Sequence, residues 1–375
     1  MPRMVFAPGA ESLSVQLVQL LRGRIAAGGG WLPFDRFMAA ALYEPGLGYY
    51  ARGNVVFGSM PQSGSDFVTA PEMTPLFGRA LARQLLQAME VAQVDEVFEF
   101  GAGSGALAEQ LLQTLGDRIG RYSIVDLSGA MRQRQSDRLR PFGDRVRWLE
   151  AWPIAMQGVV VGNEVLDAMP VQLLAWDGHT WHERGVVCHD DGGFAWADRA
   201  TNLQPPPYAG QFPPGSVTEL HGQAEAFIRS LAARLERGAA FFIDYGFPES
   251  EYYHPQRTGG TLMCHRAHRS DTDPLVDVGE KDITAHVNFS GIALAAQEAG
   301  LDVLGYTSQA HFLINSGLLD LVEHAGIVDT RATVPVNRLL GEHEMGELFK
   351  VVGFSRGIGL HDPIGFRQGD RSHTL

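Results

Sequence analysis

The segment from 94 to 115, VDEVFEFGAGSGALAEQLLQTL, constrains the fold of this chain more than any other. A run rich in Val and Phe leads into three glycines within five positions, Gly101, Gly103 and Gly105. Leucines then recur at helical spacing from Leu107 to Leu115. The pattern predicts a buried strand, a tight turn and a helix, an arrangement in which the helix N-terminus can hold a nucleotide.

The same alternation of strand and helix patterns continues toward the end of the chain. Because strands that alternate with helices form a mostly parallel sheet covered on both faces, we predict an α/β, Rossmann-like fold. The expected sheet has seven strands, at 94–100, 121–127, 145–152, 158–166, 239–246, 301–306 and 348–357.

Other segments interrupt this pattern. Residues 1–90 are expected to form an N-terminal helical cap or lid, ending in a helix that Thr74 caps and Pro75 begins. Residues 91–375 are expected to form one domain with insertions at about 171–215 and 247–288. The first insertion contains the proline cluster LQPPPYAGQFPPG, which cannot continue a central strand. Between the insertions we expect a helix that ends at Gly238, and after the second a helix that Ser290 opens.

The glycine turn fits two cofactors. Gly101, Gly103 and Ala106 satisfy the dinucleotide pattern G-x-G-x-x-G/A, which favours an NAD-dependent dehydrogenase. With Glu99, the three glycines also satisfy E-x-G-x-G-x-G. A carboxylate is unfavourable beside a pyrophosphate but favourable beside the cationic sulfonium and amino groups of S-adenosyl-L-methionine. Asp126 ends the second strand and could bind ribose hydroxyls in either case.

Composition argues against several classes of partner. The formal net charge of −13 disfavours attraction to nucleic-acid phosphates. The arginine-rich run from Arg132 to Arg147 is better explained as the solvated face of a helix. No apolar run is long enough to span a bilayer, and the N-terminus lacks the pattern of a signal or transit peptide. We therefore expect a cytoplasmic protein without membrane insertion.

A series of segments along the chain resembles the mitochondrial complex I assembly-factor arginine methyltransferases and their bacterial relatives. In the family's order, these segments are FDRFMAAALYEPGLGYY, DFVTAPEMTPLFG, FEFGAGSGALA, GNEVLDAMPV, FIDYG, GTLMCHRAH, DITAHVNF and MGELFK. The chain departs from the family at Asn288, where the family usually has Asp.

The resemblance implies a class I methyltransferase that uses S-adenosyl-L-methionine, with the last strand of its sheet antiparallel. It also implies symmetric dimethylation of an arginine on a protein partner, a respiratory complex I subunit in the mitochondrial branch. Two other interpretations stay open: methylation of a small molecule, and an assembly chaperone that binds the cofactor without catalysis.

The segment GNEVLDAMPV supplies candidates for binding an arginine acceptor. Asn163, Glu164 and Asp167 follow the fourth strand at the carboxyl edge of the sheet, where open parallel sheets bind ligands. Carboxylates can orient a guanidinium through paired hydrogen bonds. We assign Glu164 and then Asp167 to the acceptor and Asn163 to the cofactor. Alternatively, Asp167 caps a turn and Glu164 binds backbone N–H groups.

A possible lid precedes the capped helix. Asp66, Thr69, Pro71 and Glu72 stand in a segment that could close over the cofactor. We assign Thr69, Pro71 and Glu72 to cofactor binding. For Glu72 the alternative is an acid that favourably neutralises a helix start.

Histidines gather in the second insertion. His265, His268, Asp282 and His286 raise the possibility of a metal, but their spacing matches no common zinc site, and we expect none. His268 and His286 could carry the proton lost on methylation, or could make structural hydrogen bonds.

Overall fold

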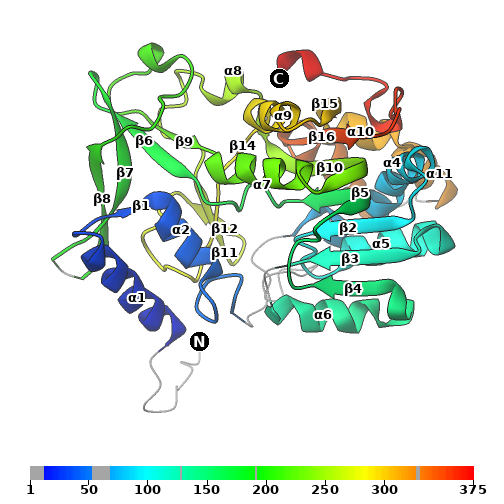
Figure 1. Cartoon of the computed structure of the whole chain (residues 1–375), viewed down its shortest axis with the longest axis horizontal. Coiled ribbons are helices and arrows are strands. Elements are labelled where there is room, and N and C mark those ends of the chain that lie inside the picture. The colour runs from blue at the N-terminus through cyan, green and yellow to red at the C-terminus, as the bar shows by residue number, and fades with distance from the viewer. Residues whose placement is uncertain (1–11, 53–67, 127–128, 191, 327–329) are drawn as a thin grey trace.

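The computed structural model describes residues 12–52, 68–126, 129–190, 192–326 and 330–375. Its largest sheet in these ranges has eight strands, in the order β15-β16-β10-β5-β2-β3-β4, with β14 paired to β10 (Figure 1). The strands are β2 (Glu96–Phe100), β3 (Arg121–Val125), β4 (Val146–Leu149), β5 (Met156–Asn163), β10 (Leu235–Phe247), β14 (Val287–Asn288), β15 (Asp302–Ser308) and β16 (Phe349–Arg356).

The α/β fold with a large mixed sheet is confirmed, with one short strand more than the seven expected. Strands β4, β3, β2, β5 and β10 run parallel to one another. The last strand, β16, runs antiparallel to both of its neighbours, β10 and β15.

Residues of the central strands alternate between two apolar cores. Val159, Val161 and Phe241 point into one cluster, and Val160 and Phe242 point into the other. Side chains of a strand alternate between faces, so a run of consecutive apolar residues indicates a strand that is buried on both faces.

Helices cover both faces of the sheet. The first core includes residues of α4 (Leu76–Ala92) and α5 (Ala106–Leu115), and the second includes residues of α7 (Gly222–Ala232) and α9 (Phe289–Glu298). The remaining helices of this part are α6 (Gly129–Leu139), α8 (Glu249–Tyr252), α10 (Gln309–Asn315), α11 (Leu318–His324), α12 (Thr330–Leu340) and α13 (Met345–Leu348). No helix among the described residues is long and apolar enough to cross a membrane.

Three helix ends differ from the expectation. Helix α4 begins at Leu76, with Pro75 as its N-cap, and the Thr74 hydroxyl accepts from the Leu76 N–H at 3.3 Å. Helix α9 begins at Phe289 because Asn288, not Ser290, is its N-cap.

Gly238 does not end α7, which stops at Ala232. It lies within β10 at a φ of 144°, where a Cβ would stand 1.8 Å from the carbonyl oxygen of Gly158. Glycine at this position permits the close approach of β10 and β5.

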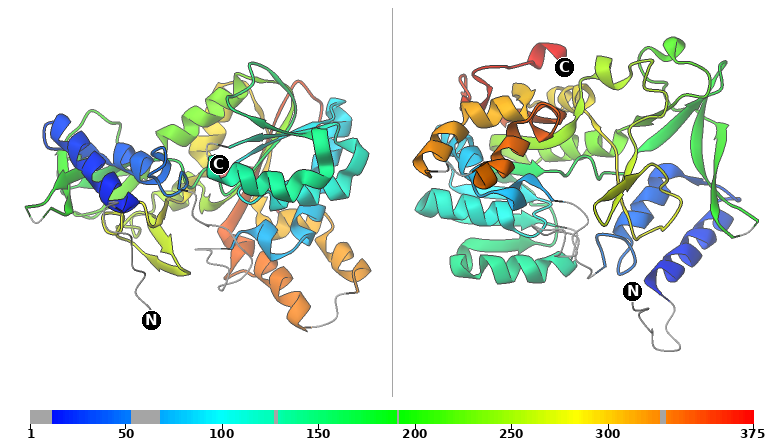
Figure 2. Two further views of the ribbon diagram at one scale, coloured as in Figure 1. Left: turned by 90° about the horizontal axis from the view of Figure 1, so that it is seen from below. Right: turned by 180° about the vertical axis from the view of Figure 1, so that it is seen from behind.

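A second lobe lies beside the main sheet rather than on one of its faces (Figure 2). It contains an antiparallel five-stranded sheet of β1 (Leu32–Pro33), β6 (Gln172–Trp176), β7 (Trp181–Cys188), β8 (Phe194–Ala200) and β9 (Val217–Leu220). Helices α1 (Leu13–Ala27) and α2 (Phe34–Tyr43) share its core with the small sheet of β11 (Met263–Arg266), β12 (Arg269–Asp271) and β13 (Asp282–Thr284). The N-terminal segment and parts of both insertions therefore pack together.

Candidate active site

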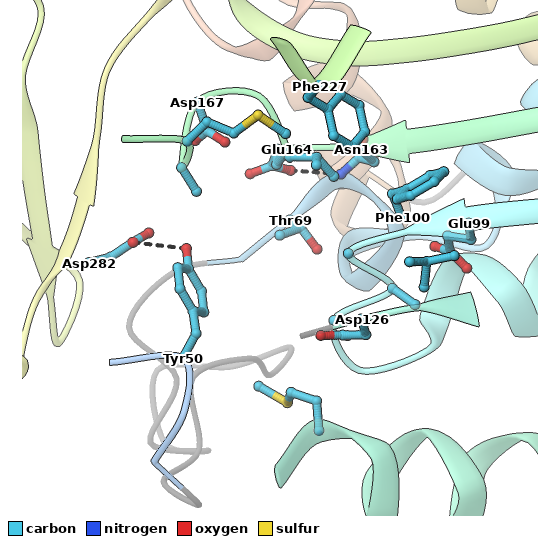
Figure 3. A pocket seen from close by; sticks show the side chains of 18 of the residues that line it. Tyr50, Thr69, Glu99, Phe100, Asp126, Asn163, Glu164, Asp167, Phe227 and Asp282 are labelled. Atoms are coloured by element: carbon cyan, nitrogen blue, oxygen red, sulfur yellow. Dashed lines mark hydrogen bonds between the residues drawn. The ribbon is translucent and has the colours of Figure 1, made fainter. Parts of the chain in front are cut away.

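A cavity of about 1020 Å³ lies between the carboxyl edge of the main sheet and the second lobe. The main sheet contributes the glycine turn and the ends of β3, β4 and β5 to its wall. The second lobe contributes Tyr43, Tyr50, His265 and Asp282. Figure 3 shows Glu99 and Asp126 toward one end, and Tyr50, Asp167 and Asp282 toward the other.

The glycine turn uses a conformation that other residues rarely adopt. Gly101, Gly103 and Gly105 have φ angles of 64°, 53° and 82°. The turn continues directly into α5, with Gly105 as its N-cap. A Cβ on Gly101 would also stand 2.9 Å from Cγ2 of Val165. The turn therefore needs glycine for its backbone geometry and, at Gly101, for close packing as well.

Glu99, the acid of the E-x-G-x-G-x-G pattern, lies in the cavity wall. Its carboxyl is 2% exposed and accepts a hydrogen bond from the Tyr122 hydroxyl at 2.6 Å. Burial raises the pKa of Glu99 to about 8. A cationic ligand would stabilise the ionised form of this buried acid.

Asp126 lies at the end of β3, beside the glycine turn. The side chain of Gln135 donates to Asp126 Oδ2 at 2.8 Å and to the carbonyl of Gly103 at 2.9 Å. Trp148 in turn donates to Gln135 Oε1 at 2.8 Å. This network fixes the carboxylate against the turn, a support that the sequence did not indicate.

Asn163 is the last residue of β5, and Glu164 begins a strained turn after it. Glu164 has a φ of 55°, which is unusual for a residue other than glycine. Its carboxyl accepts from Asn163 Nδ2 at 3.0 Å and from the backbone N–H of Ala70. Burial, with a smaller contribution from Asp167, raises the pKa of Glu164 to about 8. Backbone strain of this kind is often found at functional sites.

Asp244 of β10 supports this turn through hydrogen bonds to its backbone, and it was not among the residues predicted for the site. Its Oδ2 accepts from the backbone N–H groups of Val165, Leu166 and Asp167 at 3.1, 2.9 and 3.2 Å. The sequence contained a signal for it, because Asp244 lies in FIDYG, one of the segments on which the family resemblance rests. We call residues 163–168 the acidic turn.

Asp167 lines the cavity with one unsatisfied oxygen. Its Oδ2 accepts from the Tyr245 hydroxyl, whereas Oδ1 is buried without a hydrogen-bond partner. The residue is 4% exposed, and burial raises the pKa of Asp167 to about 6. A buried acceptor without a partner is costly, so Oδ1 is suited to a donor from a ligand.

Two tyrosines connect the acidic turn to the second lobe. Tyr50 donates to Asp282 Oδ1 at 2.8 Å, and Tyr43 donates to the carbonyl of Ala168 at 2.8 Å. The two rings stack with centroids 5.5 Å apart. Figure 3 shows the Tyr50 and Asp282 pair. Both tyrosines lie in the quoted segment FDRFMAAALYEPGLGYY, but their role was not foreseen.

Of the three expected lid residues that the structure describes, two line the cavity. Thr69 and Pro71 do so, and Thr69 precedes the short helix α3 (Ala70–Met73). The carboxylate of Glu72 instead pairs with Arg138 at 3.0 Å and accepts from the Ser104 hydroxyl. Glu72 therefore braces the glycine turn from outside the cavity wall. Asp66 lies outside the described residues.

The two candidate histidines lie in different places. His268 is exposed in the turn between β11 and β12 and is not among the described residues that line the cavity. His286 lines the cavity between the rings of Tyr245 and Phe247. Burial lowers the pKa of His286 to about 4, which makes its imidazole a weak base. The described residues contain no group of three acids, histidines or cysteines placed to hold a metal ion.

An aromatic cluster lies in the cavity wall on the side of the glycine turn (Figure 3). Phe100, Trp152 and Phe227 have ring centroids 4.6 to 5.2 Å apart. The guanidinium of Arg234 lies 5.3 Å from the Trp152 ring. This apolar cluster was not predicted, because its members come from three distant segments.

Comparison with known proteins identifies the family. Residues 80–307 match the family model described as "Putative S-adenosyl-L-methionine-dependent methyltransferase", which covers more than half of the chain. This chain belongs to that family. The methyltransferase also resembles a protein of Burkholderia thailandensis crystallised with S-adenosyl-homocysteine, with 49% identity, a TM-score of 0.92, and coverage of 99% of this chain and 100% of that one. The cofactor of the present methyltransferase is S-adenosyl-L-methionine, so the dinucleotide interpretation of its glycine turn is wrong.

More distant relatives of this methyltransferase carry a more specific name. The Drosophila melanogaster "Protein arginine methyltransferase NDUFAF7 homolog, mitochondrial" is 27% identical over 343 residues, 81% of this chain and 75% of the relative. The Danio rerio "Protein arginine methyltransferase NDUFAF7, mitochondrial" is 23% identical and covers 91% of this chain and 87% of its own length. The family expected from the sequence is confirmed.

Proposed function

We propose that this methyltransferase modifies an arginine side chain of a protein partner. The observation that carries the proposal is the number of acidic side chains in the cavity wall. Among its described residues are six acids, Glu99, Asp126, Glu150, Glu164, Asp167 and Asp282, and a single arginine, Arg234. Arg234 lies against the Trp152 ring of the aromatic cluster. A cationic acceptor is the class of substrate that compensates such a wall.

The cofactor fits the end that contains the glycine turn. Bound S-adenosyl-L-methionine supplies a methyl group that its sulfonium has already activated. In our proposal Glu99 and the three glycines face its amino acid part, Asp126 holds the ribose hydroxyls, and Asn163, Thr69 and Pro71 complete the pocket. The acids suit the positive charge of this cofactor, and the glycines permit close approach of the backbone.

The acceptor fits the acidic turn. In the proposed reaction Glu164 accepts hydrogen bonds from the guanidinium and orients one of its nitrogens, with Asp167 beside it. A bond forms between that nitrogen and the methyl carbon as the carbon–sulfur bond breaks, and the nitrogen loses a proton. Asp167 Oδ1, buried without a partner, is better suited than His286 to accept that proton, because His286 is a weak base.

The names of the curated relatives support the same acceptor. Both the Drosophila and the zebrafish proteins are called protein arginine methyltransferases. We extend the proposal to the architecture: α1, α2 and the strands of the two insertions form the cap that receives the partner. The expected boundary at residue 90 lies too far along the chain, because α4 packs on the main sheet and belongs to the methyltransferase domain.

The experiment compares cells that lack the gene, complemented with the wild-type chain or with Glu164→Gln. Mass spectrometry of the cell proteins should find a dimethylarginine that the deletion removes and only the wild type restores. Restoration by Glu164→Gln would favour a chaperone role. An unchanged protein methylome with altered small metabolites would instead identify a small-molecule methyltransferase.

A further inference from the structure

The acidic turn faces a second carboxylate from a distant part of the chain. Asp282 begins β13 in the second insertion, is 3% exposed and lines the cavity. We name the part of the cavity bounded by Tyr50, Glu164, Asp167 and Asp282 the acceptor chamber. Figure 3 shows Tyr50 and Asp282 on the wall opposite the acidic turn.

Asp282 is held in a fixed orientation. The Tyr50 hydroxyl donates to its Oδ1 at 2.8 Å. Tyr50 stacks on Tyr43 at an interplanar angle of 19°, and Tyr43 is bound to the carbonyl of Ala168. A carboxylate whose orienting partner is itself packed loses little entropy when it binds a ligand.

A second connection fixes the distance between the two walls. The backbone N–H of Ala285, three residues after Asp282, donates to the carbonyl oxygen of Asp167 at 2.9 Å. The acidic turn and β13 are therefore joined both through the tyrosines and through the backbone. The chamber is a preformed space between two rigid walls, which favours an acceptor of defined shape.

The chamber also presents an acceptor atom that has no protein partner. Asp167 Oδ1 is buried without a hydrogen bond, in a side chain that is 4% exposed and lines the cavity. Burying an acceptor in this state is unfavourable unless a ligand donates to it. The atom thus indicates a donor-bearing ligand independently of the charge of the chamber.

We infer that Asp282, oriented by Tyr50, is the second carboxylate of the acceptor site and that it selects a guanidinium over an ammonium group. This inference rests on the proposed function and names the feature that determines its acceptor. A guanidinium is planar and carries five N–H donors, so its two edges can reach carboxylates on opposite walls at once. The ammonium of lysine has three donors around one nitrogen and spans a shorter distance between two carboxylates than a guanidinium does.

The test uses the full chain saturated with S-adenosyl-homocysteine and three peptides as probes. Acetyl-Gly-Arg-Gly-amide, its lysine counterpart and its citrulline counterpart are titrated by calorimetry. Citrulline keeps the shape of arginine without the charge. The wild type should bind the arginine peptide at least about tenfold more tightly than either of the others, the worth of one charged hydrogen bond. Equal affinity for the three peptides, or no binding of any, would overturn the inference.

Variants separate the role of Asp282 from a general loss of folding. Asp282→Asn should weaken binding of the arginine peptide about tenfold and leave the affinity for S-adenosyl-homocysteine unchanged. Asp273→Asn is the matched control, because Asp273 is an exposed acid of the same insertion that does not line the cavity. It should change neither affinity. Equal effects of the two substitutions on the arginine peptide would contradict a specific role for Asp282.

Tyr50 acts through Asp282 and is a positioning residue. Tyr50→Phe should weaken binding of the arginine peptide several-fold in the wild type, and should have no further effect when Asp282 is already Asn. Such non-additivity is the mark of two residues that act through one interaction. Additive effects would show that Tyr50 has an independent structural role and would remove it from the inference.

The two proposals fail in different ways. If arginine methylation occurs in cells and does not respond to Asp282→Asn, the inference about the chamber is wrong and the proposed function stands. If the chamber binds the arginine peptide selectively and cells show no loss of methylarginine on deletion, the proposed function is wrong and the cation site stands.

Discussion

The backbone N–H of Asp167 donates to Oδ2 of Asp244 at 3.2 Å, across the gap between the acidic turn and β10. The next residue of β10, Tyr245, binds the side chain of Asp167 through its hydroxyl. Consecutive residues of one strand thus hold the main chain and the side chain of Asp167. The position of Glu164, three residues earlier, depends on the same support.

Replacing Asp244 with Asn should therefore damage the acidic turn. The amide offers one acceptor oxygen and two unwanted donors to a group of backbone N–H donors, which should lower the free energy of unfolding by about 1–3 kcal/mol. Methyl transfer should fall more than this stability loss implies, because misplacement of reacting groups by about 1 Å can cost about 100-fold in rate. Denaturant unfolding and initial rates measure the two effects.

The control for Asp244→Asn is Asp320→Asn. Asp320 makes a surface ion pair with Arg83 at 3.3 Å, and its side chain is 64% exposed. Surface pairs of this kind contribute about 0–1 kcal/mol. A similar loss of rate in both variants would show that Asp244 has no special role.

Gly101→Ala should weaken cofactor binding. An alanine at a φ of 64° is strained by about 1–2 kcal/mol, and its Cβ would also meet Val165 of the acidic turn. We expect affinity for S-adenosyl-homocysteine to fall at least about tenfold by calorimetry. Gly46→Ala is the control: Gly46 has a φ of 71° and open space around its Cβ position. An equal loss of affinity in both would refute a local effect at the turn.

Glu164→Gln should change the pH dependence of stability. The pKa of Glu164 is raised to about 8 in the folded chain, so folding favours its protonated form. The contribution of the protonated Glu164 side chain to the free energy of unfolding is fully present below pH 4.5. It is lost as the pH rises through 8, at up to about 1.4 kcal/mol per pH unit. The variant should therefore unfold at a higher temperature than the wild type at pH 8 to 9, and the advantage should shrink toward pH 5.

Thermal unfolding of the chain without cofactor, recorded from pH 5 to 9, measures this difference. Glu90→Gln is the control for removing one glutamate, because the side chain of Glu90 is 56% exposed in a surface pair with Arg118. A difference between Glu164→Gln and the wild type that does not vary with pH would contradict the assignment of a buried, proton-binding carboxyl to Glu164.

Asp126→Asn should lower the affinity for S-adenosyl-homocysteine about tenfold. The amide keeps one acceptor but loses the charge that strengthens hydrogen bonds from ribose hydroxyls, a loss of about 1.4 kcal/mol. Calorimetry with Asp117→Asn as the control measures the effect, since the Asp117 side chain is fully exposed. Unchanged affinity would place the ribose elsewhere in the cavity.

Local sequence patterns predicted the parts of the site that lie within one segment. The glycine turn follows from a strand, three glycines and a leucine-rich helix, and all three glycines have positive φ angles. Glu99 and Asp126 lie at strand ends that face the cavity. In such cases spacing along the chain determines position in space.

Contacts between distant segments could not be predicted in this way. Nothing in the pairing of β1 with β7, or of Tyr50 with Asp282, follows from local periodicity. Glu72 is an acid in the segment that we expected to contact the cofactor, yet its carboxylate pairs with Arg138 from α6. His268 lies in the turn of the hairpin of β11 and β12, where it is exposed and does not line the cavity. These outcomes depend on tertiary packing.

Transfer of a labelled methyl group tests whether this methyltransferase acts on arginine. The purified chain is incubated with methyl-labelled S-adenosyl-L-methionine and protein extract from cells that lack the gene, and the labelled product is hydrolysed to amino acids. We predict label in methylated arginine with the wild type and none with Glu164→Gln. Label confined to small molecules, or to an amino acid other than arginine, would contradict the claim.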